Sequence, residues 1–276
     1  MPKAEVLSWV RTRFMPHIWC PGCGHGIVMH ALIRALISLK KDKKETVVAS
    51  GIGCSSRMAG YIDACTLHST HGRSLAFATG IKLHRPELTV VDVMGDGDCT
   101  AIGGNHFIHA CRRNIDITAI VLNNNIYGMT GGQASPTTPL GAFATTTPYG
   151  AIDPAFDICR LAEGAGASYV ARATIADPRQ VEKLIADGIK KKGFSVVEVV
   201  THCHTQFGRK NDRRLPMDNY QFFKERSIQL AAAKDKSPEE LVGKIVCGTF
   251  VDVDTPEYTE QYQKLVIDKA RGGDHA

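Results

Sequence analysis

Several features that would define a function class are missing from this sequence. No apolar run approaches the roughly 20 residues of a membrane-spanning helix, and residues 1–14 are polar and mixed rather than shaped like a signal peptide. The net charge is only +5, with Lys and Arg scattered and no recognition motif for nucleic acid. Internal repeats and low-complexity tracts are lacking too. We therefore expect a cytoplasmic protein without membrane or nucleic-acid partners.

The composition is otherwise that of a globular protein. A chain of 276 residues, 43% hydrophobic and 22% charged, can form one large domain or one domain with an extended tail. Disulfides are rare in the cytoplasm, so the nine cysteines point instead to metal ligands or catalytic groups among them.

Strand and helix patterns alternate through the first 200 residues. The predicted strands are 46–50, 88–94, 117–122, 168–171 and, as the last strand, 194–200. The predicted helices are 26–41, 72–84, 100–113, 153–163 and one that Asp177 and Pro178 begin and that ends at Lys192. This alternation predicts an α/β fold with a doubly wound, mostly parallel sheet.

The pattern changes after Cys203. Residues 220–234 look helical and residues 241–253 hold short extended pieces, but most of this region is polar and irregular. We predict a domain over residues 1–203 and a C-terminal tail over 204–276 that packs on the domain or on a partner subunit. Within the domain, residues 123–152 form a long loop, and loops of that length are often functional.

Polar residues follow two of the predicted strands. Asp96 lies between Gly95 and Gly97 after one strand, and Asn124 follows the next. Ligands of open parallel sheets bind at the carboxyl ends of strands, and a carboxylate with an amide can hold a hard cation there. Asp96 could instead cap a helix near Thr100, and the Asn run could be a plain turn. The flanking glycines and the paired amide favour a cation site of the kind that binds the diphosphate of thiamine diphosphate.

Four cysteines form a possible second site. Cys20 and Cys23 are three residues apart, a spacing that suits a tetrahedral metal or an iron–sulfur cluster. Cys54 and Cys203 each follow a predicted strand and could converge with them. Spacing alone leaves zinc, a redox dithiol and a [4Fe-4S] cluster open. The other five cysteines occur singly, as small buried hydrophobes do: Cys65, Cys99, Cys111, Cys159 and Cys247.

Several runs together resemble the β subunit of 2-oxoacid:ferredoxin oxidoreductases. In chain order they are 20–23 (CPGC), 53–56 (GCSS), 71–73 (HGR), 95–98 (GDGD), 123–133 (NNNIYGMTGGQ) and 135–139 (SPTTP). The resemblance covers about residues 15–255. The runs 17–20 and 54–57 look most similar to the 2-oxoglutarate branch of the family.

This resemblance implies roles for individual residues. Asp96 and Asn124 would bind Mg²⁺ through their side chains and Ile126 through its carbonyl. The implied cofactor-binding residues also include Gly95, Gly97, Asp98, Ser55 and Ser56. The implied ligands of a [4Fe-4S] cluster are Cys20, Cys23, Cys54 and Cys203, although His202 and His204 beside the last leave room for another ligand. His71 would touch the diphosphate or the reacting centre, and Arg57 would meet a substrate carboxylate; either could equally be structural.

The resemblance also implies that this chain is half of a catalytic unit. It would bind the diphosphate of thiamine diphosphate, while an α subunit would supply the pyrimidine domain and its activating glutamate. Small ferredoxin-like subunits, an external ferredoxin and CoA would complete the system. The reaction would be CoA-dependent oxidative decarboxylation of a 2-oxoacid, with electrons passing through the cluster.

Other functions remain open at this point. Pyruvate or a branched-chain 2-oxoacid could replace 2-oxoglutarate, because Arg57 could meet the carboxylate that all these substrates share. A non-redox thiamine-diphosphate decarboxylase or synthase half would leave the four cysteines without a common purpose. A non-catalytic assembly subunit with a zinc site would leave the Asp96 and Asn124 pair unexplained.

Overall fold

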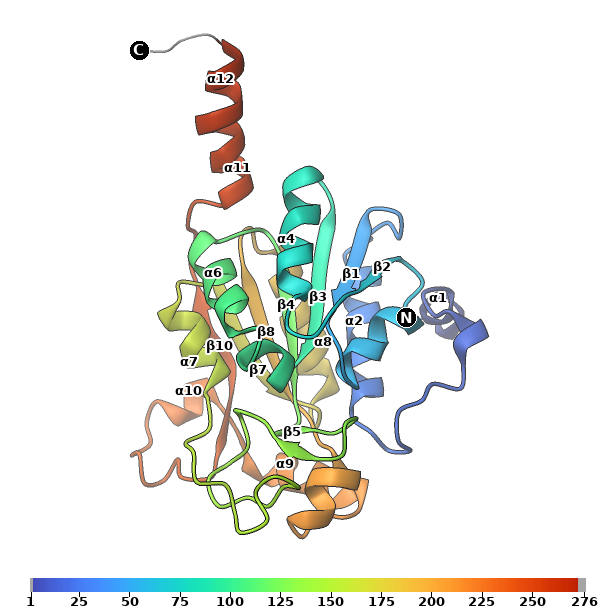
Figure 1. The fold of residues 1–276 in the computed structure, drawn as a ribbon, viewed down its shortest axis with the longest axis vertical. Coiled ribbons are helices and arrows are strands. Elements are labelled where there is room, and N and C mark those ends of the chain that lie inside the picture. Colours follow the sequence, from blue (N-terminus) through green and yellow to red (C-terminus); the bar gives the residue numbers. More distant parts are fainter. Residues whose placement is uncertain (1, 273–276) are drawn as a thin grey trace.

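An eight-stranded sheet forms the centre of the computed structural model, which describes residues 2–272 (Figure 1). In spatial order the strands are β2 (Cys65–His68), β1 (Thr46–Ser50), β3 (Thr89–Gly95), β4 (Thr118–Asn123), β8 (Ser195–Val200), β7 (Tyr169–Thr174), β10 (Ile245–Asp252) and β9 (Ser227–Gln229). All neighbouring pairs are parallel except β10 with β7, which is antiparallel. The predicted fold class, a mostly parallel α/β sheet, is confirmed.

Helices cover both faces of this sheet. On one face α2 (His25–Ser38) packs against α8 (Pro178–Lys190), and their apolar residues join one core cluster. On the other face α4 (Ser74–His84), α6 (Gly104–Arg113) and α7 (Ile158–Gly164) bury theirs in a second cluster. Because helices cover both faces, every residue of β1, β4 and β8 is buried, which explains their continuous apolar runs.

The shorter elements connect and flank these layers. They are α1 (Lys3–Ser8), α3 (Met58–Tyr61), α5 (Asp96–Thr100), α9 (Pro216–Arg226), α10 (Leu230–Ala233), α11 (Tyr258–Tyr262), α12 (Asp268–Gly272) and the hairpin of β5 (Ile126–Tyr127) with β6 (Gln133–Ala134). Short 3₁₀ turns cover Thr12–Phe14 and Ser55–Arg57, and π-helical turns cover His204–Gly208 and Gln263–Ile267. None of the helices in residues 2–272 has the length and apolar character needed to cross a membrane.

Several sequence-based boundaries are corrected. The strand predicted to be the last, 194–200, is followed by β9 and β10, and β10 extends the main sheet. The predicted helix 100–113 is two helices, α5 and α6, and 153–163 becomes helical only at Ile158. The predicted helix 220–234 ends at Arg226, where the chain turns into β9. The predicted cap of α8 is confirmed, because the Asp177 carboxylate accepts a hydrogen bond from the Gln180 N–H at 3.0 Å.

Candidate active site

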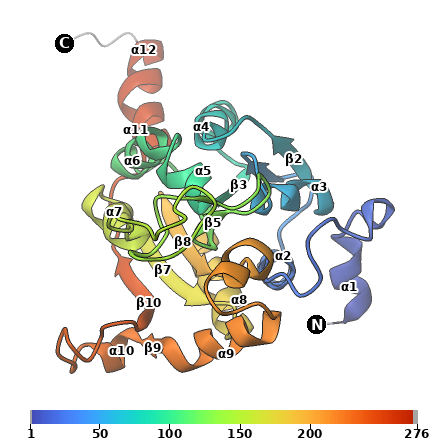
Figure 2. The same ribbon diagram turned by 60° about the horizontal axis from the view of Figure 1, so that its bottom comes forward.

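The carboxyl ends of the parallel strands meet around a cavity. Figure 2 brings this edge of the sheet forward, with the loop that carries β5 lying across it. The cavity has a volume of about 140 Å³. Its lining includes most residues predicted to bind the cofactor: Ser55, His71, Gly95, Asp96, Gly97, Asp98, Asn124 and Ile126.

Asp96 is the buried carboxylate of this cavity. It follows β3 at the start of α5, and only 3% of the residue is exposed. Its Oδ2 accepts hydrogen bonds from the hydroxyls of Ser135 and Thr137, both at 2.5 Å. Burial raises the pKa of the Asp96 carboxyl, while these two hydroxyls act in the opposite direction. Desolvation thus disfavours the ionised carboxylate, and a bound cation would favour it.

The asparagine run after β4 is tied to the same loop. Asn123 Oδ1 lies 3.0 Å from Thr137 Oγ1, whose single proton it shares with Asp96, and it accepts a hydrogen bond from the Asn125 N–H at 3.1 Å. Asn125 adopts a left-handed conformation (φ 62°), and its side chain donates to the Thr137 carbonyl at 2.7 Å. Asn124 Oδ1 lies 3.3 Å from the Ile126 N–H. These contacts form a turn in which Asn124 lines the cavity next to Asp96.

Gly97 allows a close approach between α5 and β5. A Cβ at this position would lie 2.2 Å from the ring of Tyr127, so any other residue would push the ring away. The Tyr127 hydroxyl donates a hydrogen bond to the Gly97 carbonyl at 3.3 Å. The Tyr127 ring therefore forms one wall of the cavity, a role that sequence analysis did not assign to it.

His71 and Asp98 form a pair at the cavity. Asp98 Oδ1 lies 2.7 Å from His71 Nδ1 and accepts a hydrogen bond from the Gly72 N–H at 2.5 Å. Burial raises the pKa of the Asp98 carboxyl, and the Gly72 N–H and His71 oppose this shift. His71 also contacts Tyr127 edge to face. Asp98 thus orients the imidazole that lines the cavity.

The four predicted ligand cysteines line a second cavity, of about 350 Å³. The Thr205 hydroxyl lies 3.7 Å from Cys20 Sγ and 3.6 Å from Cys203 Sγ. A Cβ on Gly128 would lie 3.2 Å from Cys203 Sγ and 3.9 Å from Cys54 Sγ, so both sulfur atoms approach this glycine. The predicted convergence of segments far apart in the sequence is therefore present.

Burial affects the acidity of these thiols. It raises the pKa of Cys23 to about 12, and the other three cysteines add to the effect. It raises the pKa of Cys54 to about 11, again with contributions from Cys203 and Cys20. Since thiolates are the form that binds a metal, a bound cluster would have to supply the positive charge that stabilises them.

The two cavities share a wall. The shared lining residues are His25, Cys54, Asn124, Gly128 and Met129. His25 is buried, and burial lowers its pKa to about 3, which makes it a neutral imidazole at physiological pH. Its Nδ1 lies 3.2 Å from Cys23 Sγ. A group in one cavity would therefore be separated from the other by one layer of residues.

Two predicted site residues lie outside both linings. Ser56 is fully buried, and its backbone carbonyl accepts a hydrogen bond from the Ser50 hydroxyl at 3.0 Å. Arg57 is half-buried, and its Nε lacks a hydrogen-bond partner within residues 2–272. Their roles stay predictions.

Sequence analysis missed other lining or supporting residues: Ser135, Thr137, His25, Tyr127 and Met129. All five lie inside or next to the runs that carried the family resemblance. Their position in those runs was a signal, but their contacts could not be inferred from it.

Comparison with known proteins first defines a class. Residues 51–199 match the family described as thiamine pyrophosphate enzyme, C-terminal TPP binding domain. This segment runs from the end of β1 to β8 and includes Asp96 and Asn124, the residues of the first cavity that were predicted to bind a cation.

More specific relatives share nearly the whole chain. The 2-oxoglutarate synthase subunit KorB of Methanocaldococcus jannaschii is 55% identical, over 95% of this chain and 97% of the relative. The same subunit of Methanothermobacter marburgensis is 49% identical, over 96% and 93%. A solved 2-oxoglutarate:ferredoxin oxidoreductase from Magnetococcus marinus, with 2-oxoglutarate, coenzyme A and succinyl-CoA bound, superposes with a TM-score of 0.84 at 31% identity, over 100% of this chain and 93% of that one. This chain belongs to the β subunits of the 2-oxoacid:ferredoxin oxidoreductases, as its sequence motifs predicted.

Proposed function

We propose that this chain is the β subunit of a 2-oxoglutarate:ferredoxin oxidoreductase and carries the diphosphate site of thiamine diphosphate together with a [4Fe-4S] cluster. The observation that carries this proposal is the wall between the two cavities. On one side Asp96 and Asn124 offer oxygen ligands, and on the other four thiols converge. An enzyme that must pass electrons from an organic cofactor to a cluster needs these two sites side by side.

The first cavity fits a diphosphate with its Mg²⁺. Asp96 and Asn124 would bind the ion through side-chain oxygens and Ile126 through its carbonyl, the hard ligands that Mg²⁺ prefers. The groups that stabilise the Asp96 carboxylate in the described structure are hydroxyls and backbone N–H groups. A divalent cation would add the positive charge that this buried carboxylate otherwise lacks.

The second cavity fits a cluster better than zinc. Two sulfur atoms bound to tetrahedral zinc at about 2.3 Å lie roughly 3.8 Å apart. Within residues 2–272, the one group of three metal-type side chains with donor atoms all within 4.8 Å of one another is Asp157, Cys159 and Glu198. The four cavity cysteines are therefore spread more widely than a single zinc ion requires, which suits the larger [4Fe-4S] unit.

The residues of this chain would bind and orient the reacting groups. Thiamine diphosphate, when bound, supplies the electron sink for decarboxylation. Tyr127 and Met129 contribute apolar surface to the lining of this cavity. His71, held by Asp98, can exchange a hydrogen bond with the diphosphate or with a polar group at the reacting centre. The net reaction converts 2-oxoglutarate and CoA to succinyl-CoA, CO₂ and one proton, and the two electrons released reduce ferredoxin.

The proposed enzyme needs other subunits. An α subunit would hold the pyrimidine end of the cofactor, small ferredoxin-like subunits and ferredoxin would accept electrons, and the assembly would work in the cytoplasm. Arg57, with an unpartnered Nε in the described structure, remains our proposal for a contact to a substrate carboxylate. Because every 2-oxoacid has that carboxylate, Arg57 does not select 2-oxoglutarate.

Anaerobic co-purification with the α subunit tests this function. We expect iron and sulfide near four atoms each per chain, and CoA-dependent reduction of viologen that is fastest with 2-oxoglutarate. The same assay with pyruvate and 2-oxoisovalerate identifies the alternative substrates if either is faster. One zinc per chain without iron, or decarboxylation without viologen reduction, would overturn the redox function.

A further inference from the structure

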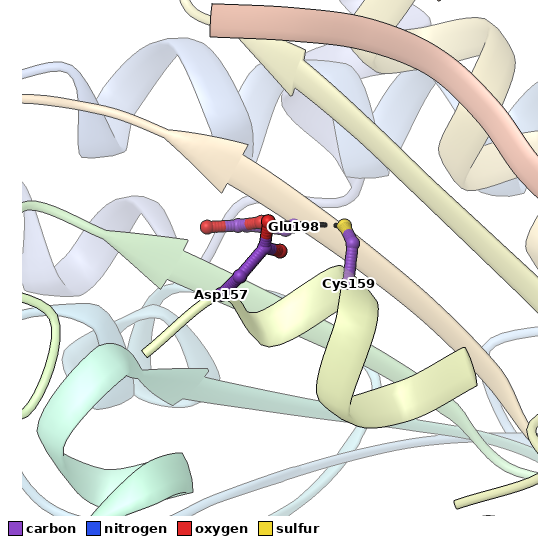
Figure 3. A group of neighbouring side chains, drawn as sticks. All are labelled: Asp157, Cys159 and Glu198. Atoms are coloured by element: carbon purple, nitrogen blue, oxygen red, sulfur yellow. Dashed lines mark hydrogen bonds between the residues drawn. The ribbon is translucent and has the colours of Figure 1, made fainter. Parts of the chain in front are cut away.

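Asp157, Cys159 and Glu198 form a compact polar cluster outside both cavities (Figure 3). The Glu198 side chain comes from β8, while Asp157 and Cys159 lie at the start of α7. These three side chains are of the types that bind metal ions, but the positively charged side chain of Arg172 already contacts the two carboxylates. Arg172 donates from Nε to Glu198 at 2.6 Å and from Nη2 to Asp157 at 2.5 Å. The guanidinium carries one positive charge and bridges the two carboxylates, so it holds this group together in the place that a metal ion would take.

The register of the sheet connects this cluster to the asparagine turn. Glu198 pairs with Arg172 of β7 on one side and with Val121 of β4 on the other. Paired residues of neighbouring strands point to the same face, and so do residues two apart along a strand. Asn123 is therefore on the face of Glu198, and its Nδ2 donates to Glu198 Oε1 at 2.8 Å.

This bond decides how the Asn123 amide is oriented. A carboxylate paired with arginine accepts hydrogen bonds and donates none, so Asn123 must present its NH₂ group to Glu198. Its Oδ1 is then turned toward Thr137 and the Asn125 N–H. Cys159 Sγ lies 3.3 Å from Glu198 Oε2, and burial and the nearby Glu198 charge raise the pKa of this thiol, which stays a donor. Every neighbour of Glu198 in this network therefore donates to it.

The orientation of the Asn123 amide affects Asp96 and Asn124, the residues proposed to bind Mg²⁺. Thr137, which contacts Asn123 Oδ1, also donates to Asp96. Asn124 follows Asn123 directly and lines the cavity. We propose that Glu198 is a positioning residue for the Mg²⁺ and thiamine diphosphate site, because it fixes the Asn123 amide and with it the turn that presents Asn124. This inference rests on the proposed function.

The substitution Glu198→Gln isolates this role, because it keeps the shape of the side chain. The amide of glutamine has one acceptor and one donor end. If its oxygen faces Arg172, its NH₂ group meets the NH₂ group of Asn123, which must then flip and turn a donor toward the Asn125 N–H. Asp157→Asn is the matched control: it also removes one carboxylate from Arg172, has no bond to Asn123, and keeps a good cap for α7.

The test measures Mg²⁺-dependent binding of thiamine diphosphate to the assembled, cofactor-depleted complex by quenching of intrinsic fluorescence. For Glu198→Gln we expect the Mg²⁺ concentration at half-saturation to rise about tenfold, as for other residues that orient a metal ligand, with turnover at saturating Mg²⁺ and cofactor within about twofold. For Asp157→Asn we expect less than about a twofold rise, since it leaves Asn123 bound. Equal effects of the two variants, or none for Glu198→Gln, would overturn the proposal.

A second variant removes the hydrogen bond between Asn123 and Glu198 by changing Asn123 instead of Glu198. Asn123→Ala leaves Arg172 with both carboxylates and should weaken Mg²⁺ binding at least as much as Glu198→Gln. The double variant should be no weaker than Asn123→Ala alone, since Glu198 acts through Asn123. Additive effects, or an Asn123→Ala complex that binds Mg²⁺ normally, would contradict the role of Glu198. If the unaltered complex shows no Mg²⁺-dependent cofactor binding, the proposed function itself fails.

Discussion

The cavity around Asp96 and the cavity lined by the four cysteines are organised differently. In the first, the residues proposed to bind the cation are held by hydrogen bonds from other parts of the protein. Ser135 and Thr137 contact Asp96. Asn123, which precedes Asn124, contacts Thr137 and Glu198. In the second, the thiols come from separate segments, and their side-chain contacts within residues 2–272 are single ones: Cys23 to His25 at 3.2 Å, and Cys20 and Cys203 to Thr205 at 3.7 and 3.6 Å.

This difference suggests that Mg²⁺ and the iron–sulfur cluster would affect the structure of their binding sites to different extents. The oxygen site is preorganised, so binding of Mg²⁺ would change the protein little. In the second cavity burial raises the pKa of Cys23 to about 12 and that of Cys54 to about 11, so these two proposed ligands are protonated thiols at neutral pH. Its ligands would become thiolates, and its segments would be fixed together, only when the cluster is inserted.

The largest effect should follow from Cys203→Ser. The cluster needs all four thiolates, and the serine hydroxyl is a poor replacement. We expect loss of iron, sulfide and viologen reduction, with thiamine diphosphate still bound, measured by metal analysis and by fluorescence quenching. Cys65→Ser, at an exposed cysteine that lines neither cavity, should keep the cluster. Retention of a full cluster by Cys203→Ser would remove Cys203 from the ligand set.

Asp96→Ala should have the next largest effect. It removes a proposed direct ligand, so we expect Mg²⁺ affinity to fall by more than about 100-fold, beyond the range for supporting residues. Cofactor should be lost on desalting while the cluster absorbance remains, and Asp96→Asn, which keeps a neutral oxygen, should lose less. Loss of cofactor and cluster together would indicate misfolding rather than loss of a ligand.

An effect of intermediate size is expected in the pH dependence of thiol alkylation, measured on the protein without its iron–sulfur cluster. Only thiolates react with iodoacetamide, so the rates at Cys23 and Cys54 should rise about tenfold per pH unit throughout the range from about pH 7 to pH 9. An ordinary thiol, with a pKa near 8.5, should begin to level off in that range. Peptide mass spectrometry gives both rates, with a cysteine-containing model peptide as control. Early levelling at Cys23 or Cys54 would contradict the raised pKa.

Ser135→Ala should have the smallest effect. The lost hydrogen bond opposes the burial-driven rise in the Asp96 pKa, so its removal should raise that pKa further. Less carboxylate would then be ionised as the pH falls. We expect Mg²⁺ affinity to drop about fivefold, or roughly 1 kcal/mol, with a larger loss near pH 6 than near pH 8. A loss that is the same at both pH values would show that Ser135 acts by packing instead.

The sequence predicted the parts of the structure that depend on local patterns. The strand 46–50 was predicted at its observed bounds, and 117–122 and 194–200 within one residue, because central parallel strands are continuous apolar runs. Asp96 and Asn124 were identifiable because each follows such a run. Sequence spacing likewise indicated Cys20 and Cys23, whereas Cys54 and Cys203 needed the assumption that strand ends converge.

The remaining features depend on contacts that no local pattern encodes. Ser135 and Thr137 are 39 and 41 residues from Asp96 in the sequence. They reach Asp96 only when the long loop after β4 has folded back over the end of the sheet. Glu198 is a charge inside an apolar run to which the sequence analysis assigned no role, and its partners Asn123 and Arg172 lie on two other strands. Strand β10 was underestimated because much of it is half-exposed and a bulge interrupts its register near Thr249.

Strand β10 also has a consequence for folding. It pairs with β7 along the side of the sheet that would otherwise be an open edge. A chain ending near residue 203 would expose the unpaired backbone N–H and C=O groups of β7, and such edges recruit strands from other molecules. The region after residue 203, about a quarter of the chain, therefore protects the sheet from self-association, and a shortened chain should aggregate.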